Sequence, residues 1–188
     1  ASVGRHDAKS CRQFRRPDGE NQSQVNRLIR LGAAVAVVAA AVSCHHLDDD
    51  RVPPAPVLIQ FNSVADWDVY GVSGAMSWRR FIKSERLPSN FPYTAMSATG
   101  FGGVLLCCDV NGNPVAYDLS CPVECRSDVR IYIDEDALVA ECPKCHSTYD
   151  VFSLWGHPLS GEAAERGYGL RRYTVRPGGM NEYRVISY

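Results

Sequence analysis

Several motifs that would indicate a nucleotide-dependent enzyme, a protease or a nucleic-acid-binding protein are missing from this chain of 188 residues. The sequence has no Walker loop, no dinucleotide-binding glycine motif and no HExxH helix. Its formal net charge is −1, so the charge balance gives no reason to expect nucleic acid as a partner. No set of nucleophile, base and acid is legible either. The sequence therefore favours an electron carrier or a structural or binding protein over an enzyme.

A hydrophobic run long enough to cross a bilayer comfortably is also missing. The longest apolar run, Leu31 to Val42, is too short for that. It follows Arg27 and Arg30 and ends in the small residues Ala41-Val42-Ser43 before Cys44. This arrangement resembles the signal peptides of bacterial lipoproteins. The resemblance implies a signal peptide over residues 27–43 and lipidation of Cys44; the alternative is a short buried helix followed by an ordinary cysteine.

The segments on either side of this run have little apolar patterning. Residues 1–26 are polar and Arg-rich, and we interpret them as disordered or as a non-native extension of the chain. Residues 44–56 contain an acidic run and three prolines, which indicates a solvated tether between the anchor and a domain. Together with the lipoprotein resemblance, this predicts a protein anchored by lipid to a membrane of the bacterial cell envelope.

Residues 57–188 have the pattern of an all-β domain. Alternating or β-rich runs are separated by turn residues such as Asn111-Gly112-Asn113. A short helical turn is expected at Arg79–Glu85, and residues 57–103 suggest no function. We expect a small antiparallel β-sandwich or barrel with metal-binding hairpin loops. The predicted strands are Val57–Phe61, Val104–Asp109, Val115–Leu119, Val129–Ile133, Ala137–Glu141, Arg171–Val175 and Tyr183–Tyr188.

Cysteine, in contrast, is plentiful: the chain has eight. Four of them form two close pairs, Cys121 with Cys125 and Cys142 with Cys145, and each pair follows a predicted strand. Loops at the ends of paired strands can meet and present four thiolates to one zinc ion or iron centre. Because an exported protein meets an oxidising compartment, disulfides are the alternative.

Two other cysteines are adjacent on one predicted strand. The side chains of Cys107 and Cys108 should point to opposite faces of the sheet, so the pair is poorly placed to bind one metal ion. Packing in the core, or one disulfide, is the expected role of these residues.

Residues 100–176 resemble Rieske-type iron–sulfur domains. Ser120-Cys121-Pro122 is similar to the first ligand box of that family, and residues 142–150 are similar to the second. The stretch 156–163 is similar to the segment that precedes the last strand. The resemblance implies a Rieske-like fold, a [2Fe–2S] cluster and electron transfer to or from a partner protein. It also implies that Ser147 and Tyr149 hydrogen-bond to sulfurs at the centre.

The ligand positions depart from the family pattern of two cysteines and two histidines. Val123 stands where the first histidine is expected, and Cys145 stands in place of the second. Cys125 is the obvious substitute for the first, and His146 is a further candidate ligand. An all-thiolate cluster would have a lower reduction potential than a histidine-ligated one. A structural zinc site with four cysteine ligands, or disulfides, in a non-redox binding module is the alternative function.

Overall fold

The computed structural model describes residues 47–178 and 183–188. The predictions for residues 1–26, the signal peptide at 27–43 and the lipidation site Cys44 lie outside the described residues. Within the described ranges, no helix has the length and apolar character needed to cross a bilayer.

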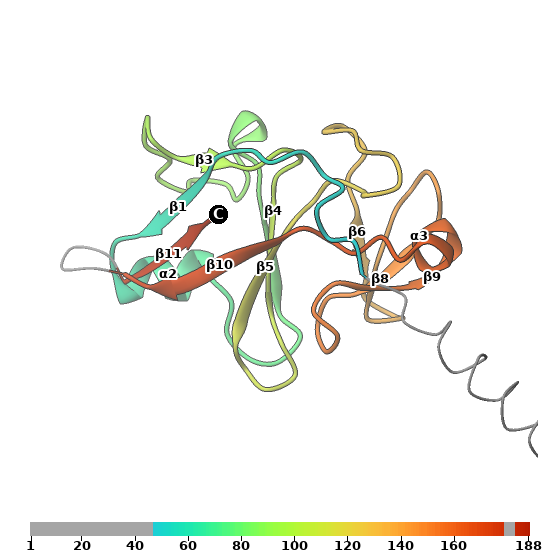
Figure 1. The fold of residues 1–188 in the computed structure, drawn as a ribbon. Helices are drawn as coiled ribbons and strands as arrows, with labels where there is room; N and C mark the ends of the chain where they lie inside the picture. Colours follow the sequence, from blue (N-terminus) through green and yellow to red (C-terminus); the bar gives the residue numbers. More distant parts are fainter. Residues whose placement is uncertain (1–46, 179–182) are drawn as a thin grey trace, which may run out of the picture. The chain divides into compact units, whose positions relative to one another are not determined.

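The described part of the chain is mostly β-structure with two short α-helices, which confirms the predicted all-β class (Figure 1). The helices are α2 (Val64–Tyr70) and α3 (Gly161–Arg166), and a 3₁₀ turn, η1, covers Lys83–Glu85. The strands are β1 (Val57–Phe61), β2 (Trp78–Phe81), β3 (Ala98–Thr99), β4 (Val104–Cys108), β5 (Pro114–Asp118), β6 (Tyr132–Asp134), β7 (Val139–Glu141), β8 (Thr148–Asp150), β9 (His157–Ser160), β10 (Arg172–Pro177) and β11 (Arg184–Ser187).

Two antiparallel sheets organise these strands. The larger has seven strands in the order β2-β4-β5-β10-β11-β1-β3 and curls into a nearly closed, barrel-like sheet. The smaller has four strands in the order β6-β7-β8-β9, and α3 packs against β9 (Figure 1). The chain therefore leaves the large sheet after β5, builds the small sheet and returns to the large one at β10.

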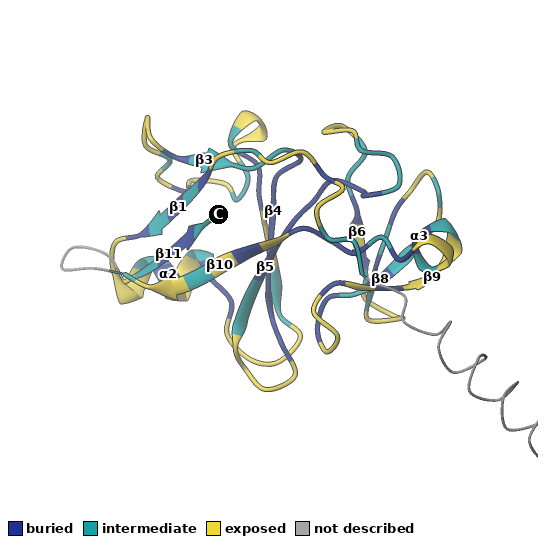
Figure 2. Ribbon diagram, viewed as in Figure 1, coloured by how far each residue is buried: buried dark blue, intermediate teal, exposed yellow. Residues whose placement is uncertain are grey.

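Strand β4 separates two hydrophobic cores. All five of its residues are buried (Figure 2). Leu105 and Cys107 pack into the core shared with the small sheet, whereas Leu106 and Cys108 pack into a second, aromatic core. Because successive side chains on a strand alternate between its faces, the two adjacent cysteines point apart, as predicted. Both are free thiols, so their role here is packing.

The aromatic core gives residues 57–103 a place in the fold. Phe61 lies edge-on to Trp67, Phe81 and Phe91, with ring centroids 4.9, 5.7 and 5.6 Å away. Such edge-to-face pairs stabilise a core by about 0.5–1.5 kcal/mol beyond the burial of their surface. This half of the domain therefore supports the large sheet.

The structure corrects two local predictions in this region. The helical turn expected at Arg79–Glu85 is wrong for its first half, because Trp78–Phe81 pairs with β4 as strand β2. Helix α2 was not predicted, although Ser63 caps it by accepting a hydrogen bond from the backbone N–H of Asp66 at 3.1 Å. A serine followed by an acidic residue three positions later is an N-terminal helix signal, and the sequence carries it at this point.

The segment predicted as a tether lies against the domain over part of its length. Val52 is fully buried, and its carbonyl accepts a hydrogen bond from the Arg171 Nε at 2.7 Å. Asp48 forms a β-bridge with Tyr168. Within the acidic run, the carboxylates of Asp49 and Asp50 pair with Arg172 and Arg171, and the Asp50 side chain is also 83% exposed to solvent.

Candidate metal centre

Two short turns carry the cysteines of interest. The first knuckle, residues 121–125, follows β5, and the second knuckle, residues 142–146, joins β7 to β8. Backbone hydrogen bonds fix the base of each turn: Cys121 N–H donates to the Val129 carbonyl at 3.1 Å, and Cys142 N–H donates to the Ser147 carbonyl at 3.0 Å. The first turn is thereby held ahead of β6 and the second between β7 and β8, next to the core that the small sheet shares with β4 and β5.

Three sulfurs from the two knuckles meet at one point. The Sγ atoms of Cys121, Cys142 and Cys145 all lie within 4.8 Å of one another, and those of Cys121 and Cys145 are 3.6 Å apart. Cys121 and Cys142 are fully buried, and Cys145 is half-buried. All six cysteines of the described ranges are free thiols, so the disulfide alternatives are not formed there. The arrangement can hold a metal ion.

The two hydroxyl groups singled out in the sequence lie against these sulfurs. The Tyr149 hydroxyl is 3.6 Å from the Cys121 Sγ, and the Ser147 hydroxyl is 3.4 Å from the Cys145 Sγ. Tyr149 belongs to β8, and Ser147 directly precedes that strand. The Ser147 hydroxyl also accepts a hydrogen bond from the Ala163 N–H at 3.2 Å, which ties the second knuckle to helix α3.

Burial and hydrogen bonding act in opposite directions on the three thiols. Burial raises the pKa of the Cys121 thiol to about 12 and also raises the pKa of Cys142. Burial acts in the same way on Cys145, but hydrogen bonds from Ser147 and from the two neighbouring thiols outweigh it and lower its pKa. Because a metal ion binds thiolates, the trio is a set of sulfurs that a cation would stabilise in their charged form.

The structure does not bring the other two predicted ligands into the trio. The Cys125 Sγ donates to the Pro122 carbonyl at 3.1 Å and to the Arg51 carbonyl at 3.5 Å, outside the group of three. The His146 side chain is 74% exposed, and its Nδ1 lies 3.0 Å from a carboxylate oxygen of Glu141. Four converging sulfurs were predicted; three converge.

Sequence reasoning passed over one charged residue in the first knuckle. The Glu124 side chain is only 15% exposed, and its carboxylate pairs with the Lys144 ammonium group of the second knuckle. This ion pair joins the two turns, and the Glu124 carboxylate, like the Cys125 sulfur, lies outside the group of three. The signal was present in the sequence, because an acidic residue stands three positions after Cys121, as Cys145 stands three positions after Cys142.

One sulfur–sulfur distance in the trio is close to the value expected around a single tetrahedral ion. Zn–S bonds of about 2.3 Å place thiolate sulfurs about 3.8 Å apart around one zinc ion. The 3.6 Å separation of Cys121 and Cys145 is close to this value. Thiolate donors and the absence of a disulfide among these residues also suit a thiophilic ion such as zinc or iron.

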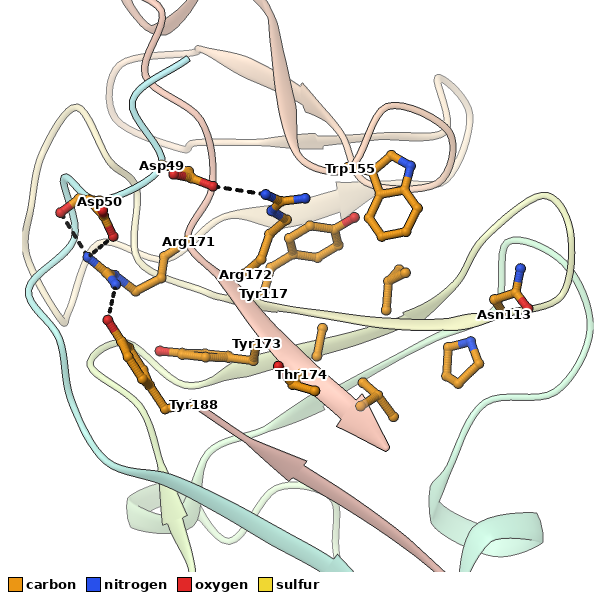
Figure 3. A pocket seen from close by; sticks show the side chains of 14 residues that line it. Asp49, Asp50, Asn113, Tyr117, Trp155, Arg171, Arg172, Tyr173, Thr174 and Tyr188 are labelled. Atoms are coloured by element: carbon orange, nitrogen blue, oxygen red, sulfur yellow. Dashed lines mark hydrogen bonds and ion pairs between the residues drawn. The ribbon is translucent and has the colours of Figure 1, made fainter. Parts of the chain in front are cut away.

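A separate cavity of about 620 Å³ lies between the segment that contains Asp49 and Asp50 and strands β5 and β10 (Figure 3). None of the three clustered cysteines lines it. Arg171 reaches Asp50 and the Tyr188 hydroxyl there, and Arg172 reaches Asp49. Both guanidinium groups at the cavity are therefore already paired with acidic or hydroxyl partners of this chain.

Comparisons with protein-family models, with curated proteins and with solved structures each found no match. The side chains and their geometry therefore define the kind of site.

Proposed function

We propose that this protein is a metal-binding β-domain in which Cys121, Cys142 and Cys145 hold one Zn²⁺ ion. The observation that carries the proposal is the convergence of three sulfurs from two separate loops within 4.8 Å of one another. Bound zinc has no redox chemistry; it would cross-link the two knuckles and stabilise the small sheet between them. The domain is then a non-redox binding module, and the lipoprotein resemblance of residues 27–44 would place it at a membrane of the cell envelope.

The distance between the Cys121 and Cys145 sulfurs supports a single ion over a two-iron cluster. In Rieske centres, two cysteines bind one iron and two histidines bind the other. By resemblance, Cys121 and Cys142 would share an iron and Cys145, at a histidine position, would bind the other. Yet the Cys121 and Cys145 sulfurs are only 3.6 Å apart, as ligands of one ion would be.

A [2Fe–2S] electron-transfer protein is the second candidate, and a specific observation favours it. Ser147 and Tyr149 contact the sulfurs of Cys145 and Cys121, as the Rieske resemblance anticipates for hydroxyls that tune a cluster. The half-buried Cys145 would give an electron a short path to a partner protein. This candidate shares the same trio of cysteines and differs in the metal.

Metal analysis of the protein purified without oxygen separates the two candidates. One zinc per chain in a colourless protein supports the proposal. Two irons and two sulfides per chain, visible absorbance and an EPR signal on reduction would establish the electron carrier instead. A Cys142→Ser variant is the control, since it should lose the metal under either candidate. A wild-type protein that binds neither metal would refute both.

A further inference from the structure

The two knuckles have the same backbone conformation, residue for residue. Each begins with Cys-Pro, and in each the N–H of the fifth residue donates to the carbonyl of the first: Cys125 to Cys121 at 2.9 Å, and His146 to Cys142 at 3.0 Å. The fifth residue is left-handed in both, with φ of 49° at Cys125 and 55° at His146. Equivalent positions should therefore direct their side chains in equivalent directions.

The turn residues of the two knuckles agree with this equivalence. The second to fourth residues, 122–124 and 143–145, form the turn in each, and the fifth residue lies beyond it. The fourth residue thus has the same place in both turns. In the second knuckle the residue at this position is Cys145, a member of the trio.

The fifth position points elsewhere in both turns. His146 is largely exposed and pairs with Glu141. Cys125 occupies the corresponding place, and its sulfur contacts the carbonyls of Pro122 and Arg51. The sequence spacing had made Cys125 the natural fourth ligand, but the shared turn geometry places it one residue beyond the ligand position.

From this equivalence we infer that Glu124, and not Cys125, is the fourth protein ligand, so that three thiolates and one carboxylate form the centre. The inference rests on the proposed function. Carboxylate oxygen is a known zinc ligand, at about 2.0–2.2 Å. The Glu124 side chain is 15% exposed, and its carboxylate is paired with the Lys144 ammonium group, so it is an ionised oxygen donor on the fourth position of the first knuckle.

In this structure Lys144 holds the Glu124 carboxylate outside the group of three sulfurs. Its ammonium group pairs with Glu124, while its own side chain is 55% exposed. An ion pair with one partner this exposed is weak, so a metal ion can draw the carboxylate away at small cost. Lys144 occupies the third position of the second knuckle, which is equivalent to Val123 in the first. Its positive charge would offset part of the negative charge of three thiolates and a carboxylate.

X-ray absorption at the zinc edge of the full chain, stripped of metal and loaded with one equivalent of zinc, tests the assignment. The wild-type protein should give three sulfurs at about 2.3 Å and one oxygen at about 2.0–2.2 Å. Glu124→Cys, which copies the second knuckle, should convert this to four sulfurs. Cys125→Ser is the matched control and should leave three sulfurs and one oxygen.

Affinity gives an independent readout. Loss of a residue that only hydrogen-bonds to a metal ligand weakens metal binding by about 10- to 100-fold. Glu124→Gln should weaken zinc binding by more than this. Cys125→Ser should leave the zinc affinity within about threefold of the wild-type value. Four sulfurs in the wild type with one lost in Cys125→Ser would overturn the inference in favour of Cys125. Three sulfurs in Glu124→Cys would overturn it in favour of a non-protein fourth ligand. A wild type that binds no zinc would instead be a failure of the proposed function.

Discussion

Removing the metal from the site should destabilise the domain by an amount that can be separated from the loss of a buried side chain. Cys142 and Cys107 form a matched pair, because both are fully buried and both are free thiols. Replacing either by alanine deletes one sulfur from the same hydrophobic core. Only Cys142 belongs to the trio of sulfurs. The difference between the two variants therefore isolates the contribution of the bound ion.

The size of that contribution follows from mass action. Zinc in excess at about 1,000 times its dissociation constant stabilises the folded state by about 4.1 kcal/mol. For a chain of this length, each kcal/mol raises Tm by about 2–4 °C, so zinc should raise the Tm of the wild type by about 8–16 °C over the chelated protein. Deletion of one buried sulfur should cost about 1–3 kcal/mol in either variant.

Thermal unfolding followed by circular dichroism, with zinc and with a chelator, measures these quantities. Cys107→Ala should lose stability in both conditions and keep the full zinc-dependent rise in Tm. Cys142→Ala should lose the rise altogether. An equal rise in both variants would refute the assignment of Cys142 as a ligand, and a wild type indifferent to chelation would refute a stabilising metal.

Three further predictions concern residues around the site and in the core. Tyr149→Phe should change the free energy of unfolding of a zinc protein by less than about 1 kcal/mol, but it should lower the reduction potential, measured by voltammetry, if the centre is iron. Arg171→Met should free the segment around Val52 and cost about 2–4 kcal/mol, seen as faster proteolysis before residue 57. Asp118→Asn should cost about 2–4 kcal/mol in urea unfolding, since the Asp118 carboxylate accepts three backbone N–H groups and the Tyr173 hydroxyl.

The pH dependence of the Asp118 effect has a definite sign. Burial raises the pKa of this carboxyl above its usual 3.8, although hydrogen bonds to Tyr173, Ser120, Phe101 and Gly102 oppose the shift. Its contribution to stability is then fully present below the unfolded-state pKa and is lost as pH rises through the folded-state pKa. The free-energy gap between wild type and Asp118→Asn should shrink as pH rises from about 4. A gap that widens over this range would show that the hydrogen bonds prevail over burial.

Much of the fold could be predicted because its strands carry clear local signals. The predicted Val57–Phe61 strand matches β1 in both bounds, and its buried positions alternate along the strand. The Asn111-Gly112 turn joins β4 to β5 as expected. Strand β9 could not be predicted in this way, since its sequence His-Pro-Leu-Ser has no β-rich pattern and depends on pairing with β8.

The ligand set could be predicted only in part, for a physical reason. Sequence spacing shows which cysteines are near one another along the chain, but not which side of a turn each side chain faces. Cys125 lies in the left-handed region, with φ of 49°, and this conformation turns its sulfur toward the Pro122 carbonyl. A single extra residue between the cysteines of the first knuckle therefore moves the second sulfur off the site, while the matching position falls to Glu124.

The small sheet shows why a metal ion suits this position in the fold. Its strands β6, β7 and β8 have only three residues each, at the short end of the range for globular proteins. Cys121 begins the loop that precedes β6, Cys142 begins the loop between β7 and β8, and both residues belong to the core that also contains Ile131 and Tyr149. An ion bound there would fix the two loops against each other. The same cross-link would be lost on chelation, so the amide protons of β6 to β8 should exchange faster in the metal-free protein while those of β4 and β5 keep their protection.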